Sequence, residues 1–233
     1  MSLITSPSRL AQRGTNTVGS NSRGARRKRK ARVGSKRRGK KTRDLKSTVL
    51  ILVQGEITEK EYFDTLVRQR GWSSGVAVTV KVQSEAPDQM ARRAVKWRRD
   101  YDWVFVVTDV DEWTPQQFSK AQSLSERSNA GNQIKLVITN PKFDLWLCAH
   151  YRTMKAGCDD ARVTQVEKEL RILVNRRGRK DSQRRKHIPT DFPHGDFDEA
   201  SQRVNEVEFG RINDQGSTSV PKMVRLIDGL NSK

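Results

Sequence analysis

The stretch Trp103–Trp113, WVFVVTDVDEW, is the part of the sequence that decides the fold. Its first five residues are uncharged and mostly β-branched or aromatic, which is typical of a strand buried on both faces of a mostly parallel sheet. Asp109 and Asp111 follow, where open α/β sheets place their ligands. Alternation along an extended chain directs both carboxylates to one side, which predicts a shared Mg²⁺ or Mn²⁺. The alternative interpretation is an acidic strand-to-helix turn in which an aspartate caps the next helix.

Around this stretch, apolar runs alternate with amphipathic helical patterns. Strands and helices are expected in turn at 49–53, 59–70, 76–82, 86–99, 103–109, 115–128 and 134–139. Thr58 and Glu61 fit a capping box for the first helix. The alternation predicts an α/β fold with a mostly parallel central sheet flanked by helices. The ends of three strands would then bring residues 54–56, 109–111 and 140–144 to one rim of the sheet.

Positive charge is concentrated at the amino terminus. Of the formal net charge of +19, residues 1–46 carry +15, from 16 Lys and Arg against Asp44, which leaves only +4 for the rest. A segment with so little apolar surface cannot offset the entropy of ordering, so we expect a disordered basic tail that binds RNA or DNA through phosphates. A localisation signal and a solubilising tail are the alternatives. The predicted contacts are Arg26, Arg27, Lys28, Arg29, Lys30, Arg37, Arg38, Lys40 and Lys41.

The carboxyl-terminal part, 152–233, is predicted to be a helical extension with a basic loop at 176–189. An amphipathic helix is expected at 163–177, and closing helices at 199–209 and 223–230. The basic loop either holds a phosphate backbone or is a solvated linker. Its predicted nucleic-acid contacts are Arg184, Arg185 and Lys186.

Several classes of protein are disfavoured by what the sequence lacks. Two cysteines without a CxxC or Cys/His cluster argue against structural zinc and against a disulfide-stapled secreted fold. No stretch approaches the roughly 20 apolar residues of a membrane span, and no apolar segment of a secretory signal precedes the basic run. We therefore expect a cytoplasmic protein without a membrane association. The sequence does not fix the oligomeric state, and a homo-oligomer stays open.

Three motifs carry a resemblance to a known family: QGEITEKEYF at 54–63, DVDEW at 109–113 and TNPKFDLWLCAHY at 139–151. In this order, with a basic leader before them and TSVPKMVRLIDGL at 218–230 after them, they resemble the RloB-like proteins. Such proteins have a Toprim-type α/β domain. The resemblance implies a Toprim-like domain over residues 47–151.

The resemblance also implies a function, namely metal-dependent phosphodiester hydrolysis by a nuclease that acts in phage defence beside an ATPase partner, RloA. No GxxxxGK[ST] motif is present, so the ATPase would be a separate protein. By position, Asp109 and Asp111 correspond to the metal-binding aspartates, Asp144 to the acid after the Asn-Pro turn and His150 to the histidine that closes the next helix. DNA, tRNA and other RNA all remain open as substrates.

The residues themselves suggest simpler roles for part of the third motif. Its aromatic side chains are expected in the core, and His150 is expected to be a hydrogen-bonded or capping histidine rather than a metal ligand. Asp144 is different because an acid in an apolar helical turn needs a partner, which a metal or an arginine would provide.

One position departs from the family pattern. The glutamate before the glycine, which is the acid/base position of Toprim chemistry, falls on Gln54, and an amide cannot exchange a proton at neutral pH. Glu56 is the nearest replacement, although an offset of two residues moves a side chain by ~6 Å. Three alternatives stay open: Glu56 takes over the role, the enzyme is slow, or the protein is a non-catalytic nucleic-acid-binding or regulatory subunit.

Overall fold

The computed structural model describes residues 46–110, 113–127, 133–155, 157–177 and 184–232. The nine predicted contacts of the basic tail, and Asp111, lie outside the described residues. The strands are β1 (Ser47–Val53), β2 (Val76–Val82), β3 (Trp103–Asp109), β4 (Gln133–Asn140), β5 (Val174–Arg177), β6 (Arg184–His187), β7 (Asn205–Glu206) and β8 (Ser217–Thr218). The helices are α1 (Thr58–Gln69), η1 (Trp72–Ser74, a 3₁₀ turn), α2 (Pro87–Trp97), α3 (Pro115–Arg127), α4 (Asp144–Ala149), α5 (Asp160–Leu170), α6 (Phe197–Gln202) and α7 (Val220–Asn231).

The central sheet has the order β2-β1-β3-β4-β8-β7. Its first four strands are parallel, and β8 pairs with β4 in the antiparallel sense. The predicted α/β fold with a mostly parallel sheet flanked by helices is therefore confirmed. In the register, Val53 lies opposite both Val82 and Val107, and Asp109 lies opposite Thr139. The carboxyl ends of the four parallel strands therefore meet at one edge of the sheet.

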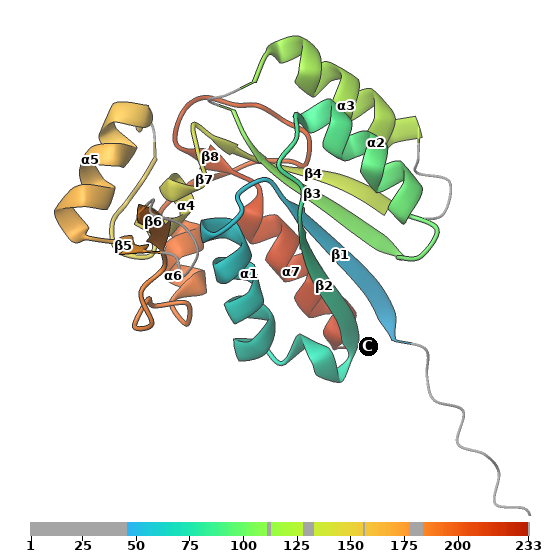
Figure 1. The fold of residues 1–233 in the computed structure, drawn as a ribbon, viewed down its shortest axis with the longest axis horizontal. Coiled ribbons are helices and arrows are strands. Elements are labelled where there is room, and N and C mark those ends of the chain that lie inside the picture. Colours follow the sequence, from blue (N-terminus) through green and yellow to red (C-terminus); the bar gives the residue numbers. More distant parts are fainter. Residues whose placement is uncertain (1–45, 111–112, 128–132, 156, 178–183, 233) are drawn as a thin grey trace, which may run out of the picture. The chain divides into compact units, whose positions relative to one another are not determined.

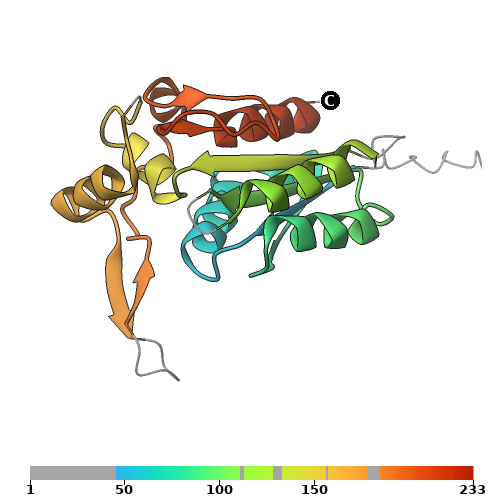
Figure 2. The same cartoon turned by 90° about the horizontal axis from the view of Figure 1, so that it is seen from above.

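Alternate residues of the buried strands feed two separate cores, as the period of two in a strand requires. In β1, Leu50 and Leu52 belong to the core beneath α2 and α3, whereas Val49, Ile51 and Val53 belong to the core on the other face. Helices α1 and α7 cover that second face (Figures 1 and 2). Because both faces of the central strands are covered, their sequences read as continuous apolar runs.

The chain beyond residue 151 contains helices, as expected, but also four short strands that the sequence analysis did not predict. The expected helix at 163–177 is wrong after Leu170, because Arg171 takes a left-handed conformation (φ 51°) and Ile172 N donates to Glu167 O over 3.1 Å, which ends α5. Val174 then begins β5, whose pairing with β6 turns the flanks of the expected basic loop into a hairpin. The helix expected at 199–209 ends at Gln202 and is followed by β7.

The predicted capping box at the start of α1 is wrong. Ile57 is the capping residue and makes no side-chain capping bond. The Glu61 carboxylate instead accepts hydrogen bonds from His187 Nδ1 (2.6 Å) and from Ile188 N (3.0 Å). A contact across 126 residues of sequence thus replaces the local bond that the motif suggested.

Candidate functional site

A cavity of about 480 Å³ lies at the carboxyl edge of the parallel strands. It collects residues from the turns after β1, β3 and β4, which is where ligands bind in open α/β sheets. The sequence-predicted residues Gln54, Glu56, Asp109 and Asp144 all line it. The lining is completed by Gly55, Thr58, Glu59, Ser84, Trp113, Lys142 and Phe143. The three motifs, far apart in sequence, therefore form a single site.

Asp109 is the last residue of β3, and the backbone on both sides of it is held by β4. Before it, the strand pairs in parallel register up to Thr139. After it, Val110 N donates to Thr139 O (3.2 Å) and to Pro141 O (2.9 Å). The Asn140–Pro141 peptide bond is cis. The strand pairing and the two hydrogen bonds of Val110 N fix the backbone that carries the Asp109 carboxylate.

Gln54 is held by two side chains that the sequence analysis did not identify. Its Oε1 accepts hydrogen bonds from Thr108 Oγ1 (2.9 Å) and from Trp113 Nε1 (3.1 Å). An indole nitrogen only donates, so the atom that faces Trp113 must be the amide oxygen, and the NH₂ group occupies the other end of the side chain. A carboxylate at this position would place its second oxygen where Gln54 has an amide donor.

Glu59 is a functional-site residue that sequence reasoning missed. Its side chain is buried (9% exposed), and Oε1 accepts a hydrogen bond from Gly55 N over 3.1 Å. A Cβ atom on Gly55 would lie 1.5 Å from Glu59 Oε2, so the glycine leaves the space that the carboxylate fills. The only sign of this role in the sequence was that Glu59 belongs to the first motif. The role itself follows from the close approach of the Gly55 backbone to the Glu59 carboxylate.

Glu56 lies at the exposed mouth of the cavity, whereas Gln54 is half-buried. The two side chains of the turn after β1 therefore occupy different environments. A carboxylate is an acid/base group, whereas an amide is not. Glu56 can therefore serve as an acid or base at the exposed part of the cavity, but its side chain does not occupy the half-buried position of Gln54.

Asp144 begins α4 and has the partner that its apolar surroundings require. Lys186 Nζ lies 3.8 Å from Asp144 Oδ2 and 2.6 Å from Glu167 Oε2. Burial lowers the pKa of Lys186, but the hydrogen bond that Lys186 donates to Glu167 and the negative charges of Asp144 and Glu167 outweigh it, so that the pKa is raised overall. The predicted need for a partner is met here by a lysine of β6.

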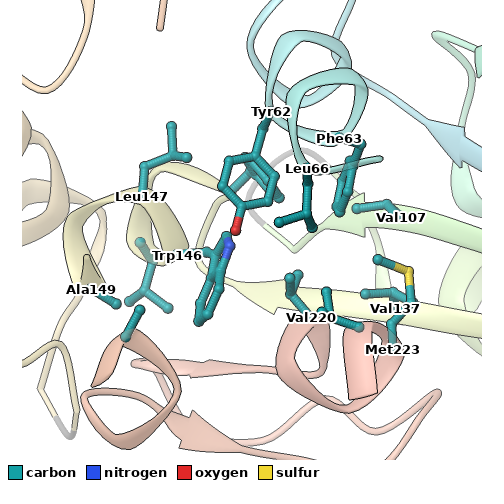
Figure 3. Close-up of a cluster of buried hydrophobic side chains, with 14 of the residues drawn as sticks. Tyr62, Phe63, Leu66, Val107, Val137, Trp146, Leu147, Ala149, Val220 and Met223 are labelled. Atoms are coloured by element: carbon teal, nitrogen blue, oxygen red, sulfur yellow. The ribbon is translucent and has the colours of Figure 1, made fainter. Parts of the chain in front are cut away.

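The rest of the third motif packs into the core, as its residue types indicated. Trp146 is fully buried among residues of α1, α4 and α7 (Figure 3). His150 is buried and hydrogen bonded through Nε2 to Tyr62 Oη (3.2 Å) and through Nδ1 to Pro193 O (2.9 Å). Burial lowers the pKa of His150 to about 4, so the ring is neutral at pH 7. The interpretation of His150 as a hydrogen-bonded core histidine is confirmed.

The carboxylate oxygens at the cavity suit a hard cation, because Mg²⁺ prefers oxygen ligands of this type. Among the described residues, no three His, Cys, Asp or Glu side chains form a cluster that could hold a metal ion. Mg²⁺ does not need such a cage, since it usually keeps several waters and binds one or two carboxylates together with substrate phosphates. Asp109 lies at the cavity, and Asp111 follows it by two residues. The residues therefore fit a cation that is held partly by substrate.

The fold and the site together define an α/β protein with an acid-lined cavity at the carboxyl edge of its parallel sheet. Comparison with protein families matches residues 49–227 to the RloB-like protein family. The chain belongs to this family. No curated protein and no solved structure matches it. Within the part of the chain that the structure describes, no helix has the length and apolar character needed to cross a membrane.

Proposed function

We propose that this protein is a Mg²⁺- or Mn²⁺-dependent nuclease that hydrolyses phosphodiester bonds by Toprim-type chemistry. The observation that carries the proposal is the cavity itself, where Glu56, Asp109 and Asp144 come from three separate turns at one edge of the sheet. Membership of the RloB-like family supports it. Placement of an acid/base group beside metal-binding carboxylates is the arrangement that phosphodiester hydrolysis requires.

In this proposal, Asp109 and Asp111 hold the cation, which when bound polarises the phosphate and stabilises the leaving oxyanion. Glu56 at the mouth takes or delivers the proton. Gln54 orients its neighbours through Thr108 and Trp113. Asp144 links the cavity to Lys186.

A second candidate is favoured by one specific observation at Gln54. Its amide oxygen accepts two hydrogen bonds, and its NH₂ group neither accepts a proton nor ligates a cation. A non-catalytic nucleic-acid-binding or regulatory subunit that keeps the shell of the site would have this geometry. The hydrogen bonds from Thr108 and Trp113 can also be made to a glutamate oxygen, which makes the substitution Gln54→Glu informative.

The two candidates are separated by cleavage assays on purified full-length protein with RNA and with DNA, in Mg²⁺ and in Mn²⁺. A nuclease loses cleavage by at least about 100-fold in Asp109→Ala and gains in Gln54→Glu, since a group that exchanges protons then occupies the deeper position. Asp198→Ala, which removes an exposed acid of α6, is the matched control and should cleave like wild type. If wild type and Gln54→Glu are both inert with the partner ATPase present, the nuclease proposal fails and the binding-subunit proposal stands.

We further propose that the protein acts in anti-phage defence with a separate RloA-like ATPase. The support is the family membership alone. A gene for an ATPase beside the gene for this protein, and copurification of the two products, are the expected results. Cells that carry both genes should resist phage, and cells that carry Asp109→Ala should not.

A further inference from the structure

A second cavity, of about 440 Å³, lies in the groove between α2 and α3, which pack side by side on one face of the sheet (Figure 1). It is lined by Glu85, Gln89, Arg92, Arg93, Val95, Lys96 and Leu124. This lining contains three cations and one acid. The function proposed for the carboxyl-edge cavity uses none of these residues. We call the second cavity the α2–α3 groove.

The positive charge of the groove comes from one face of α2. Residues three or four apart in a helix share a face, and Arg92, Arg93 and Lys96 have this spacing. All three are exposed, whereas Ala91 and Ala94 beside them are buried in the core beneath the helix. The amphipathic pattern of α2 therefore places its cations along the wall of the groove.

The single acid of the groove is already paired. Glu85 accepts a hydrogen bond from Arg93 Nε over 2.7 Å, and the two side chains form an ion pair. Within the described residues, by contrast, the side chains of Arg92 and Lys96 make no ion pair. Like charges four positions apart destabilise a helix. An anion bound beside Arg92 and Lys96 would remove that repulsion.

The floor of the groove is apolar. Val95 of α2 and Leu124 of α3 are half-buried and pack on the core beneath these helices. A groove with an apolar floor and a cationic wall fits a ligand that carries both anionic groups and apolar surface. A nucleic-acid strand has both, since its phosphates alternate with sugars and bases.

The groove begins next to the carboxyl-edge cavity. Ser84 lines that cavity, and the following residue, Glu85, lines the groove. Because α2 follows β2, it starts at the carboxyl edge of the sheet and runs back along one face. Its 11 residues span about 16 Å. A strand that leaves the cavity past Ser84 therefore has a continuous path along the cations of α2.

We infer that the α2–α3 groove is an extension of the substrate site, in which Arg92 and Lys96 bind backbone phosphates on one side of the phosphate at the cavity. This inference rests on the proposed function of that cavity. Contacts of this kind position a nucleic acid without reading its sequence. They also supply attraction beside an acid-lined cavity, which by itself repels a polyanion until a cation is bound. The sequence analysis placed no nucleic-acid contact on α2.

The test is a salt titration of binding by the full-length protein, without divalent cations so that no cleavage occurs. The probes are a single-stranded RNA and a DNA duplex. Arg92→Gln with Lys96→Gln removes both charges, and Arg92→Lys with Lys96→Arg keeps them. The matched control, Arg68→Gln with Arg225→Gln, removes two exposed arginines from α1 and α7, which cover the opposite face of the sheet.

The variant without the two charges should lower the slope of log K against log salt by about 2 and weaken binding about tenfold near 0.1 M salt. The variant that keeps the charges should bind like wild type. The melting temperature of the first variant should equal or exceed that of wild type, because a like-charge pair is removed. A loss on either probe supports the inference, and the probe that responds identifies the nucleic acid. Equal affinity and slope in the groove variant and the control would overturn it and leave the groove to an acidic segment of a partner protein.

A second measurement separates the groove from the basic tail, which is also expected to bind phosphates. Bound nucleic acid should slow the chemical acetylation of Lys96 severalfold, read by mass spectrometry, and should leave Lys222 of α7 unchanged. Equal rates at Lys96 with and without nucleic acid would overturn the inference. Absence of cleavage in Mg²⁺ would count against the proposed function and leave these binding results unchanged.

Discussion

The turns after β1 and β3 lie next to each other in the sheet and differ in chemistry. Strand β3 ends in the carboxylate of Asp109, whereas the turn after β1 begins with an amide, Gln54, and both side chains line the cavity. The two are joined by hydrogen bonds, since Thr108 of β3 and Trp113 beyond it both donate to the Gln54 oxygen. The comparison teaches that the two neighbouring turns are tied together by hydrogen bonds although their residues differ, one a carboxylate and the other an amide.

The largest effect on stability that we expect concerns the helix that follows the β1 turn. Tyr62 of α1 bonds to His150, whose pKa is lowered to about 4 from its ordinary value of 6.5. Between these values the unfolded chain binds a proton that the folded protein excludes, so stability is complete above about pH 6.5 and falls as the pH drops toward 4. The loss should reach about 3 kcal/mol.

Urea denaturation of wild type and His150→Gln at a series of pH values measures this loss. Only the wild-type free energy of unfolding should contain the His150 component, and the pH dependence due to His194 is common to both proteins. Parallel curves for the two proteins would show that folding does not lower the pKa of His150.

Gly55→Ala tests the support of the β1 turn directly. The new Cβ would displace the buried Glu59 carboxylate, which it would approach to 1.5 Å, and would break the bond from Gly55 N. The expected loss is about 2 kcal/mol in the free energy of unfolding. Gly195→Ala is the matched control, because a Cβ there meets nothing within 4 Å. If both variants unfold like wild type, Glu59 does not shape the turn.

The smallest effect that we expect concerns the hydrogen bond from Trp113 to the side chain at position 54. Trp113→Phe removes the indole donor to Gln54 and should cost about 1 kcal/mol. In the Gln54→Glu background the same substitution should cost about 2 kcal/mol, because a hydrogen bond to a charged acceptor is stronger. A double-mutant cycle by thermal or urea denaturation measures the difference. Equal costs in the two backgrounds would mean that the indole does not distinguish the two groups.

The parallel pairing of β1 to β4, and the meeting of their carboxyl ends, could be predicted because apolar runs alternate with helical patterns, whereas the order of the strands in the sheet was not predicted. That prediction places Gln54, Asp109 and Asp144 at one edge of the sheet, and all three line the cavity there. The support of Gly55 by Glu59 could not be predicted, because it depends on how closely a turn approaches a helix. The hydrogen bond between Glu61 of α1 and His187 of β6 was not predicted either. The two residues are far apart in sequence, and the sequence pattern around Glu61 favoured a local helix cap.

Mn²⁺ binding, followed by electron paramagnetic resonance or calorimetry, tests most directly the central claim that the carboxyl-edge cavity is a metal-dependent site. Wild type should bind Mn²⁺, Asp109→Ala should bind it at least about tenfold more weakly, and Gln54→Glu should bind it more tightly because it adds a carboxylate at the cavity. Asp198→Ala should bind like wild type. Unchanged Mn²⁺ affinity in Asp109→Ala would contradict the account.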